Sequence, residues 1–185
     1  MKRDNRSRTI DGRAQDPYFW LVHAKQLDKA AMLIWAKIRQ DLLNMSQLPA
    51  GTVIELERVP FADLGGVFWL NAGLALENLL KGIIIGSRPD SVVEGRISSR
   101  LKTHDLLRLA KCASIELSVI DAFFLQIGTQ CVTWAGRYPS SLRGGESQPP
   151  VFSEADVIAY RSLFERLVAN FEPGSEKRVA FRRLT

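Results

Sequence analysis

The sequence predicts an all-α protein, an up-and-down bundle of four long helices plus one short helix. Apolar residues recur at helical spacing in several long segments, and helix-capping residues stand where those segments begin. No alternation of strands with helices is visible, which argues against a parallel sheet. We assign the bundle to residues 16–171 and expect disordered basic tails over residues 1–15 and 172–185.

The first helix is predicted to begin at Asp16, because an N-cap residue followed by proline is a common helix start. It spans about eight turns. Its charged residues, Asp28 among them, are expected to face water. After it, residues 52–59 fit a short strand. The apolar stripe of the helix comprises Trp20, Ala24, Leu27, Ala31, Ile34, Ile38 and Leu42.

The second helix, residues 64–85, is apolar almost all round, which is typical of a helix surrounded by others. Gly73 and Gly82 are expected to let neighbouring backbones come close. Glu77 and Lys81 stand one turn apart in the favourable order for a salt bridge. These interrupting charges favour a buried helix over a membrane span, so we expect no membrane partner.

Residues 86–103 form a long polar connection that carries four basic residues, and loops of this length are often functional or disordered. Thr103 is predicted to cap the short helix that follows, with Asp105 in its first turn. The four basic residues are Arg88, Arg96, Arg100 and Lys102.

Two further long helices complete the bundle. One begins near Ser118 and ends where Gly136 and Pro139 stop it. The other opens at Ser153. The apolar positions of the first are Ile120, Phe123, Phe124, Ile127, Cys131 and Trp134, and those of the second are Val157, Tyr160, Phe164, Leu167 and Phe171.

The net charge of +5 lies in the two tails, which leaves the body of the chain neutral overall. A basic binding surface must therefore be a local patch or the tails themselves. Cys112 and Cys131 fall in apolar helical patterns without metal-ligand spacing, and we interpret them as reduced core thiols of a cytoplasmic protein. The motifs of P-loop enzymes, zinc hydrolases and serine hydrolases are missing, so we expect neither a metal nor a cofactor.

Three segments, in their order and spacing, resemble the HEPN family of helical-bundle proteins. They are "NAGLALENLLKGIII" (71–85), "THDLLRLAK" (103–111) and "WAGRYPSS" (134–141). The resemblance implies a four-to-five-helix bundle that is often a homodimer, in a family found beside nucleotidyltransferases and in toxin–antitoxin and defence systems. Some members are metal-independent ribonucleases that use an arginine and a histidine with four to six residues between them. Here Arg100 and His104 have only three residues between them, so the spacing departs from that pattern.

The candidate site residues leave two interpretations open. His104 either pins the long connection to the bundle or, as a neutral imidazole at a helix start, serves as a base with Arg100 as its catalytic partner. Arg137 and Tyr138 either finish a helix or, with Arg100, Lys102 and His104, form an anion site for nucleotide or RNA phosphate.

We therefore expect a non-catalytic HEPN-like module that binds a nucleotide, a nucleic acid or a protein partner such as a nucleotidyltransferase or an antitoxin. The alternative is a metal-independent endoribonuclease toxin that uses His104 with Arg100 or Arg137.

Overall fold

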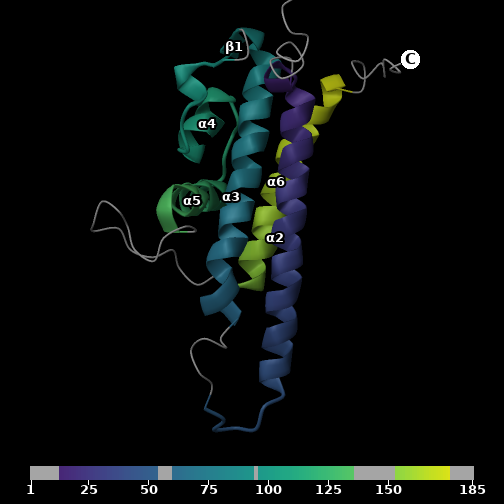
Figure 1. Ribbon diagram of the computed structural model, residues 1–185, viewed down its shortest axis with the longest axis vertical. Helices are drawn as coiled ribbons and strands as arrows, with labels where there is room; N and C mark the ends of the chain where they lie inside the picture. The colour runs from purple at the N-terminus through teal and green to yellow at the C-terminus, as the bar shows by residue number, and fades with distance from the viewer. Residues whose placement is uncertain (1–12, 54–59, 94–95, 136–152, 176–185) are drawn as a thin grey trace, which may run out of the picture.

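The computed structural model describes residues 13–53, 60–93, 96–135 and 153–175, and these are mostly helical (Figure 1). The all-α prediction is confirmed. The first long helix, α2 (Pro17–Ser46), begins as the sequence predicts. The Asp16 carboxylate accepts a hydrogen bond from the backbone N–H of Tyr18 at 2.9 Å, which satisfies one of the free donors at the helix start. The predicted strand over residues 52–59 lies largely outside the described residues.

One residue of α2 departs from the predicted pattern. Asp28, expected to face water, is only 8% exposed, because it faces helix α6 (Glu154–Ser175). Its carboxylate accepts hydrogen bonds from the Tyr160 hydroxyl, at 2.9 Å, and from the Arg161 guanidinium. Two donors from α6 therefore compensate the burial of this charge. The residues buried along α2 are Leu21, Ala24, Asp28, Ala31, Trp35 and Ile38.

Helix α3 (Pro60–Ser87) is the central element and contacts α2 and α6 as well as the helices that follow it in the chain. By length and composition its segment Leu64–Ser87 is able to cross a membrane, but the apolar stretch is 72% buried inside the molecule, as in a core helix. The predicted close approach of a neighbouring backbone is confirmed at Gly73, where an added Cβ would lie 2.9 Å from the carbonyl oxygen of Gly128, whereas Gly82 approaches side chains. A Cβ added at Gly73 would lie 2.8 Å from Val132 Cγ2, and one at Gly82 would lie 2.7 Å from Phe171 Cε2.

The connection after α3 contains more regular structure than the sequence predicts. Two 3₁₀ turns, η2 (Pro89–Ser91) and η3 (Ser99–Leu101), flank a hairpin of β1 (Val92–Val93) and β2 (Arg96–Ile97), which pair antiparallel. The expectation of a plain polar loop is wrong, because two of its few apolar residues are core residues. Val92 and Leu101 are each 2% exposed, and they hold the connection against the bundle.

The short helix α4 (Leu106–Cys112) begins later than predicted. Its N-cap is Asp105, whose side chain accepts a hydrogen bond from the N–H of Arg108 at 2.9 Å. Thr103, the predicted cap, instead accepts a hydrogen bond from the N–H of Asp105 at 3.1 Å. The threonine therefore forms a local turn, and the stronger carboxylate acceptor two residues on starts the helix.

Helix α5 (Val119–Gln130) begins as predicted with a capping box between Ser118 and Asp121, and it continues into a π-helical turn, η4 (Cys131–Ala135). Ile120 and Phe123, expected in its core stripe, are instead 59% and 46% exposed. The buried side of α5 is formed by Asp121, Phe124, Leu125, Ile127 and Gly128. The predicted stop at Gly136 and Pro139 lies outside the described residues.

The last helix, α6, starts after Ser153, whose hydroxyl accepts a hydrogen bond from the N–H of Asp156 at 3.3 Å. Its predicted stripe is buried from Val157 to Leu167, and Phe171 packs partly buried against the core. The helix continues to Ser175. The predicted boundary of the C-terminal tail at residue 172 therefore falls inside α6.

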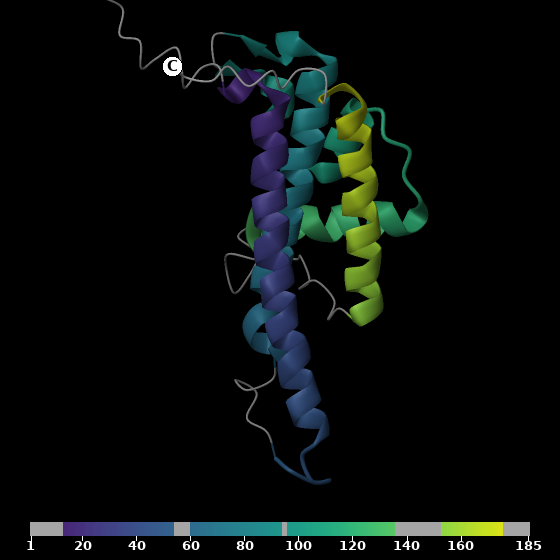
Figure 2. The same cartoon turned by 90° about the vertical axis from the view of Figure 1, so that its right-hand side faces the viewer.

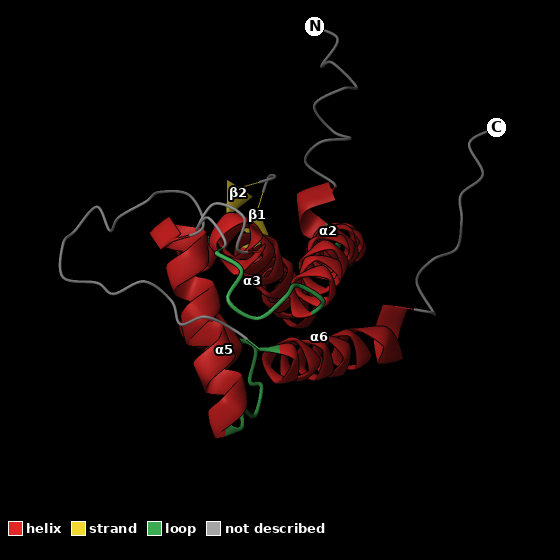
Figure 3. Cartoon of the chain, turned by 90° about the horizontal axis from the view of Figure 1, so that it is seen from below, coloured by secondary structure: helices red, strands yellow, loops and turns green. Residues whose placement is uncertain are grey.

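The helices are arranged in two directions. α3 and α6 run antiparallel to α2 along the long axis of the molecule, whereas α5 is seen nearly end-on in Figure 1 and lies across the other helices in Figure 2. Seen from below, α3 lies between α2 and α5, with α6 covering one side (Figure 3). The up-and-down description therefore fits α2, α3 and α6, and α5 departs from it.

Candidate functional site

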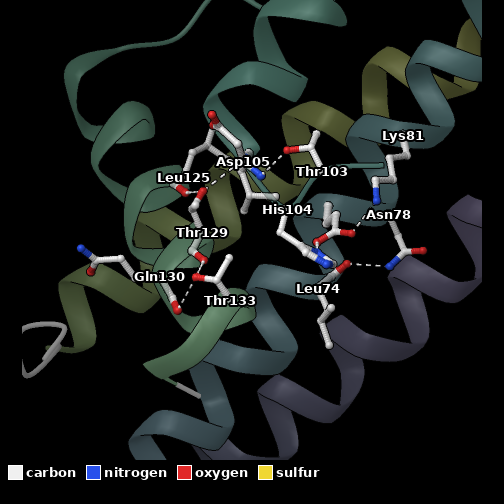
Figure 4. A network of polar contacts seen from close by, with 12 residues as sticks. Leu74, Asn78, Lys81, Thr103, His104, Asp105, Leu125, Thr129, Gln130 and Thr133 are labelled. Atoms are coloured by element: carbon white, nitrogen blue, oxygen red, sulfur yellow. Dashed lines mark hydrogen bonds and ion pairs between the residues drawn. The ribbon is translucent and has the colours of Figure 1, made fainter. Parts of the chain in front are cut away.

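A buried carboxylate in the middle of α3 is the centre of the candidate site. Glu77 is 5% exposed, and both of its oxygens have partners, Lys81 and His104, which Figure 4 labels. Oε1 accepts a hydrogen bond from Lys81 Nζ at 2.6 Å, and Oε2 lies 2.9 Å from His104 Nδ1. The predicted pairing of Glu77 with Lys81 is thus confirmed, and the pair reaches a polar partner from another element. We call Glu77, Lys81 and His104 the carboxylate–histidine cluster.

Hydrogen bonds to two other helices hold the chain around His104 in place. The residue precedes the Asp105 cap of α4, and the next backbone N–H, that of Leu106, donates to Thr129 Oγ1 of α5 at 3.0 Å. The Thr129 hydroxyl in turn donates to the carbonyl of Leu125 at 2.8 Å, so the side chain is fixed inside its own helix (Figure 4). The chain around His104 is therefore held by α5 on one side and by Glu77 of α3 on the other.

The cluster combines a hidden carboxylate with an accessible imidazole. The side chain of Glu77 is 7% exposed and that of Lys81 10%, whereas that of His104 is 50% exposed. An ionised carboxylate only accepts hydrogen bonds, so Nδ1 of His104 carries the hydrogen that the contact shares. The second ring nitrogen is left to bind a ligand or to exchange a proton. Chemically, the cluster can orient an imidazole at the surface, and it can equally anchor the loop.

The structure brings together only part of the predicted site. Arg100 lies in η3 and Lys102 directly follows it, and both are exposed. Within the described part of the chain, neither side chain forms a hydrogen bond or ion pair, with His104 or with any other residue. Arg137 and Tyr138 lie outside the described residues.

The segment around Arg100 is rich in exposed cations. We call residues 88–111 the basic segment; it runs through η2, the hairpin, η3 and α4, at one end and side of α3 (Figure 1). Its acids are Asp90, Glu94 and Asp105, of which Glu94 lies outside the described residues and Asp105 caps a helix. None of its cations forms an ion pair with a described carboxylate. The exposed cations are Arg88, Arg96, Arg100, Lys102, Arg108 and Lys111.

The sequence did not reveal that His104 and Glu77 are partners. The available signal was an acid in an otherwise apolar helix, which requires a polar partner when it is buried. That partner, His104, is 27 positions away in the sequence, so only the folded chain shows which residue it is. The contact of Asp28 with Tyr160 was unpredictable for the same reason, because the two residues are 132 positions apart in the sequence.

Burial, followed by the charge of Asp28, raises the pKa of Tyr160 well above its usual value, so the phenol stays a hydrogen-bond donor.

The Cys131 thiol is unsuited to chemistry at this site. Burial raises the pKa of Cys131 to about 12, which keeps it protonated and unreactive, and Cys112 is half-buried. Among the described residues, no three His, Cys, Asp or Glu side chains gather to hold a metal ion.

Comparison of the chain with protein-family models, with curated proteins and with solved structures gives no match. The carboxylate–histidine cluster and the basic segment therefore carry the functional argument.

Proposed function

We propose that this protein is a non-catalytic, HEPN-like helical module of the cytoplasm that binds a phosphate-bearing ligand, a nucleotide or a nucleic acid, through the basic segment. His104 acts in it as an anchor. In keeping with the resemblance of its motifs, the module forms a homodimer and works with a protein partner, such as a nucleotidyltransferase or an antitoxin, in a toxin–antitoxin or defence system.

The contact between His104 and Glu77 is the observation that carries the anchoring role. Because Glu77 is buried and already paired with Lys81, its second oxygen fixes the imidazole relative to α3. The backbone bond from Leu106 to Thr129 fixes the same stretch from the side of α5. His104 thereby holds Arg100 and Lys102, which precede it, close to the bundle surface.

The charge of the basic segment supports a phosphate-bearing ligand. Six cations stand against three acids in this segment, although the body of the chain is neutral overall. Exposed arginine and lysine side chains without carboxylate partners bind phosphate at little desolvation cost. The basic segment therefore has the positive charge that a nucleotide or nucleic acid requires.

Binding should depend on Arg100 and Lys102 more than on total charge. We expect the Arg100→Ala/Lys102→Ala double variant to bind a labelled single-stranded RNA roughly tenfold more weakly, with a smaller slope of log K against log salt, because two phosphate contacts are lost. Fluorescence anisotropy across a salt series measures both quantities. A parallel titration with ATP separates a nucleotide site from a nucleic-acid site.

The matched control is Lys29→Ala/Lys37→Ala, which removes the same charge from exposed positions of α2. It should bind as the wild type does. Equal weakening by the control pair, or no binding of either probe by the wild type, would contradict the proposal.

The second candidate function is a metal-independent endoribonuclease, and one observation favours it. A carboxylate that holds Nδ1 of a half-exposed histidine is an arrangement that orients an imidazole for proton transfer. In this alternative His104 is the base and Arg100 or Arg137 stabilises the phosphate charge. Cleavage of RNA in the presence of a chelator, lost in His104→Ala, would establish it and overturn the non-catalytic assignment.

A further inference from the structure

Helix α2 is longer than the helix that covers one of its sides. In Figure 2 the C-terminal part of α2 projects well beyond the start of α6. The start of α6 is marked by Glu154, whose carboxylate lies 3.4 Å from Arg39 Nε of α2. Leu43, one turn further along α2, shares the face of Arg39 but lies beyond the start of α6, and it is 51% exposed.

A shallow groove lies at this point. It consists of two adjoining hollows of about 330 and 380 Å³, both lined by Met32 and Trp35. The first hollow lies between α2 and α6, and the second is lined by residues of α2 alone. Val157 and Ile158 of α6 line the first hollow, and Leu43 lines the second. Ile158 is 65% exposed, so large aliphatic side chains stand beside an apolar floor. The exposed side chains of Leu43 and Ile158 are available to pack against a partner.

The charges that line the groove balance one another. Two cations, Arg39 and Arg161, and two anions, Glu154 and Glu165, lie along it. Arg39 approaches Glu154 at 3.4 Å, and Arg161 Nη2 donates to Glu165 at 2.8 Å. A nucleic acid would select for cations alone, as in the basic segment. A surface that carries both signs in equal number, around apolar side chains, is complementary to itself.

We propose that a second copy of this chain occupies the groove and that the two α2 helices pack antiparallel about a two-fold axis. With the axis between Ala36 and Arg39, Leu43 of each copy faces Met32 of the other. Each Arg39 then faces the small side chain of Ala36, which lets the helices come close. One patch thus supplies both the projecting side chain and the hollow, as an interface with two-fold symmetry requires.

This interface places the homodimer of the proposed function on a defined surface, and to that extent rests on that function. The groove is separate in sequence from the basic segment, which α2 and α6 do not contribute to. A dimer of this kind would carry two basic segments, one per copy. Loss of dimerisation and loss of phosphate binding are therefore separable results.

Sedimentation equilibrium of the full chain tests the proposal. The wild type should be a dimer at micromolar concentration, and Leu43→Asp and Ile158→Asp should each raise the dimer dissociation constant at least about a hundredfold, since two-fold symmetry places each change in the interface twice. The control is Ile120→Asp, which puts the same charge at an exposed isoleucine of α5, outside the groove, and should leave the dimer intact.

A monomeric wild type would overturn the proposal, as would Leu43→Asp and Ile158→Asp proteins that remain dimeric. Loss of the dimer in Ile120→Asp alone would place the interface on α5 and overturn it as well. Anisotropy with labelled RNA, run on the same samples, reports the basic segment independently. Binding that persists in monomeric Leu43→Asp separates the two proposals.

Discussion

Replacing Glu77 with alanine should destabilise the protein by about 4 kcal/mol. The change leaves Lys81, whose side chain is 10% exposed, without its counter-ion, and removing one partner of a buried ion pair costs about 3–5 kcal/mol. The lost bond to His104 adds no more than about 1 kcal/mol, because that side chain is 50% exposed and water replaces the partner. The midpoint of thermal unfolding should fall by roughly 10 °C or more.

Urea unfolding followed by far-UV circular dichroism at pH 7 measures the change, with an unaltered m value as evidence that the same transition is compared. The control is the double variant Glu77→Met/Lys81→Met, which removes both charges and keeps the volume. We expect its free energy of unfolding to lie within about 1 kcal/mol of that of the wild type, because apolar side chains can replace a buried ion pair. His104→Ala alone should cost about 1 kcal/mol.

The reasoning about the cluster would be refuted by a Glu77→Ala loss below about 1 kcal/mol, which would mean that Lys81 finds water or another acceptor. It would also be refuted if the double methionine variant were as unstable as Glu77→Ala. In that case the cost would come from packing at this point of α3 and not from the unpaired charge.

Two further predictions concern the junctions of α5. Burial alone would raise the pKa of Asp121, but hydrogen bonds from Arg166 and Ser118 outweigh it and lower the pKa below 3.8. The ionised Asp121 carboxylate therefore stabilises the fold fully above that value, and this stabilisation is lost as the pH falls through the folded-state pKa. The free energy of unfolding should therefore fall below about pH 4 more steeply in the wild type than in Arg166→Met, and parallel urea curves for the two proteins would contradict this. Gly73→Ala should cost about 1–3 kcal/mol in the same assay, because its Cβ would lie 2.9 Å from the carbonyl oxygen of Gly128. Gly86→Ala, whose Cβ meets only ordinary contacts, is its control and should be nearly neutral.

The segments that form helices were predictable from the sequence because helix caps and apolar patterns are local features. The Asp16 cap, the Ser118 capping box and the apolar run of α3 each depend on residues within one or two turns of one another. The start of α4 was misplaced for a local reason too, since Thr103 and Asp105 are both good capping residues. Only the folded chain shows that the threonine is used in a turn.

The direction of α5 and the partners of the buried charges could not be predicted from local patterns. Ile120 and Phe123 fit a helical stripe, yet the crossing of α5 over α3 turns the other side of the helix inward. Gly73 approaches Gly128 closely at this crossing, and neither glycine alone identifies the other. The candidate site had the same difficulty, because the sequence placed His104 beside Arg100 whereas the fold placed it on Glu77.

Three buried carboxylates each join elements that are distant in sequence. Asp28 binds α2 to α6 through Tyr160 and Arg161, Asp121 binds α5 to α6 through Arg166, and Glu77 binds α3 to the start of α4 through His104.

The first two junctions use arginine as the cation from the other element, and arginine in a protein can only donate hydrogen bonds. The third uses an imidazole, which can give or take a proton and is half exposed. Of the three junctions, the one at Glu77 therefore has the group that the endoribonuclease alternative requires, and it adjoins the basic segment that carries Arg100 and Lys102. His104→Arg, which would keep a hydrogen-bond donor at the junction but remove the imidazole, separates the two roles: ligand binding that survives it assigns His104 to anchoring alone.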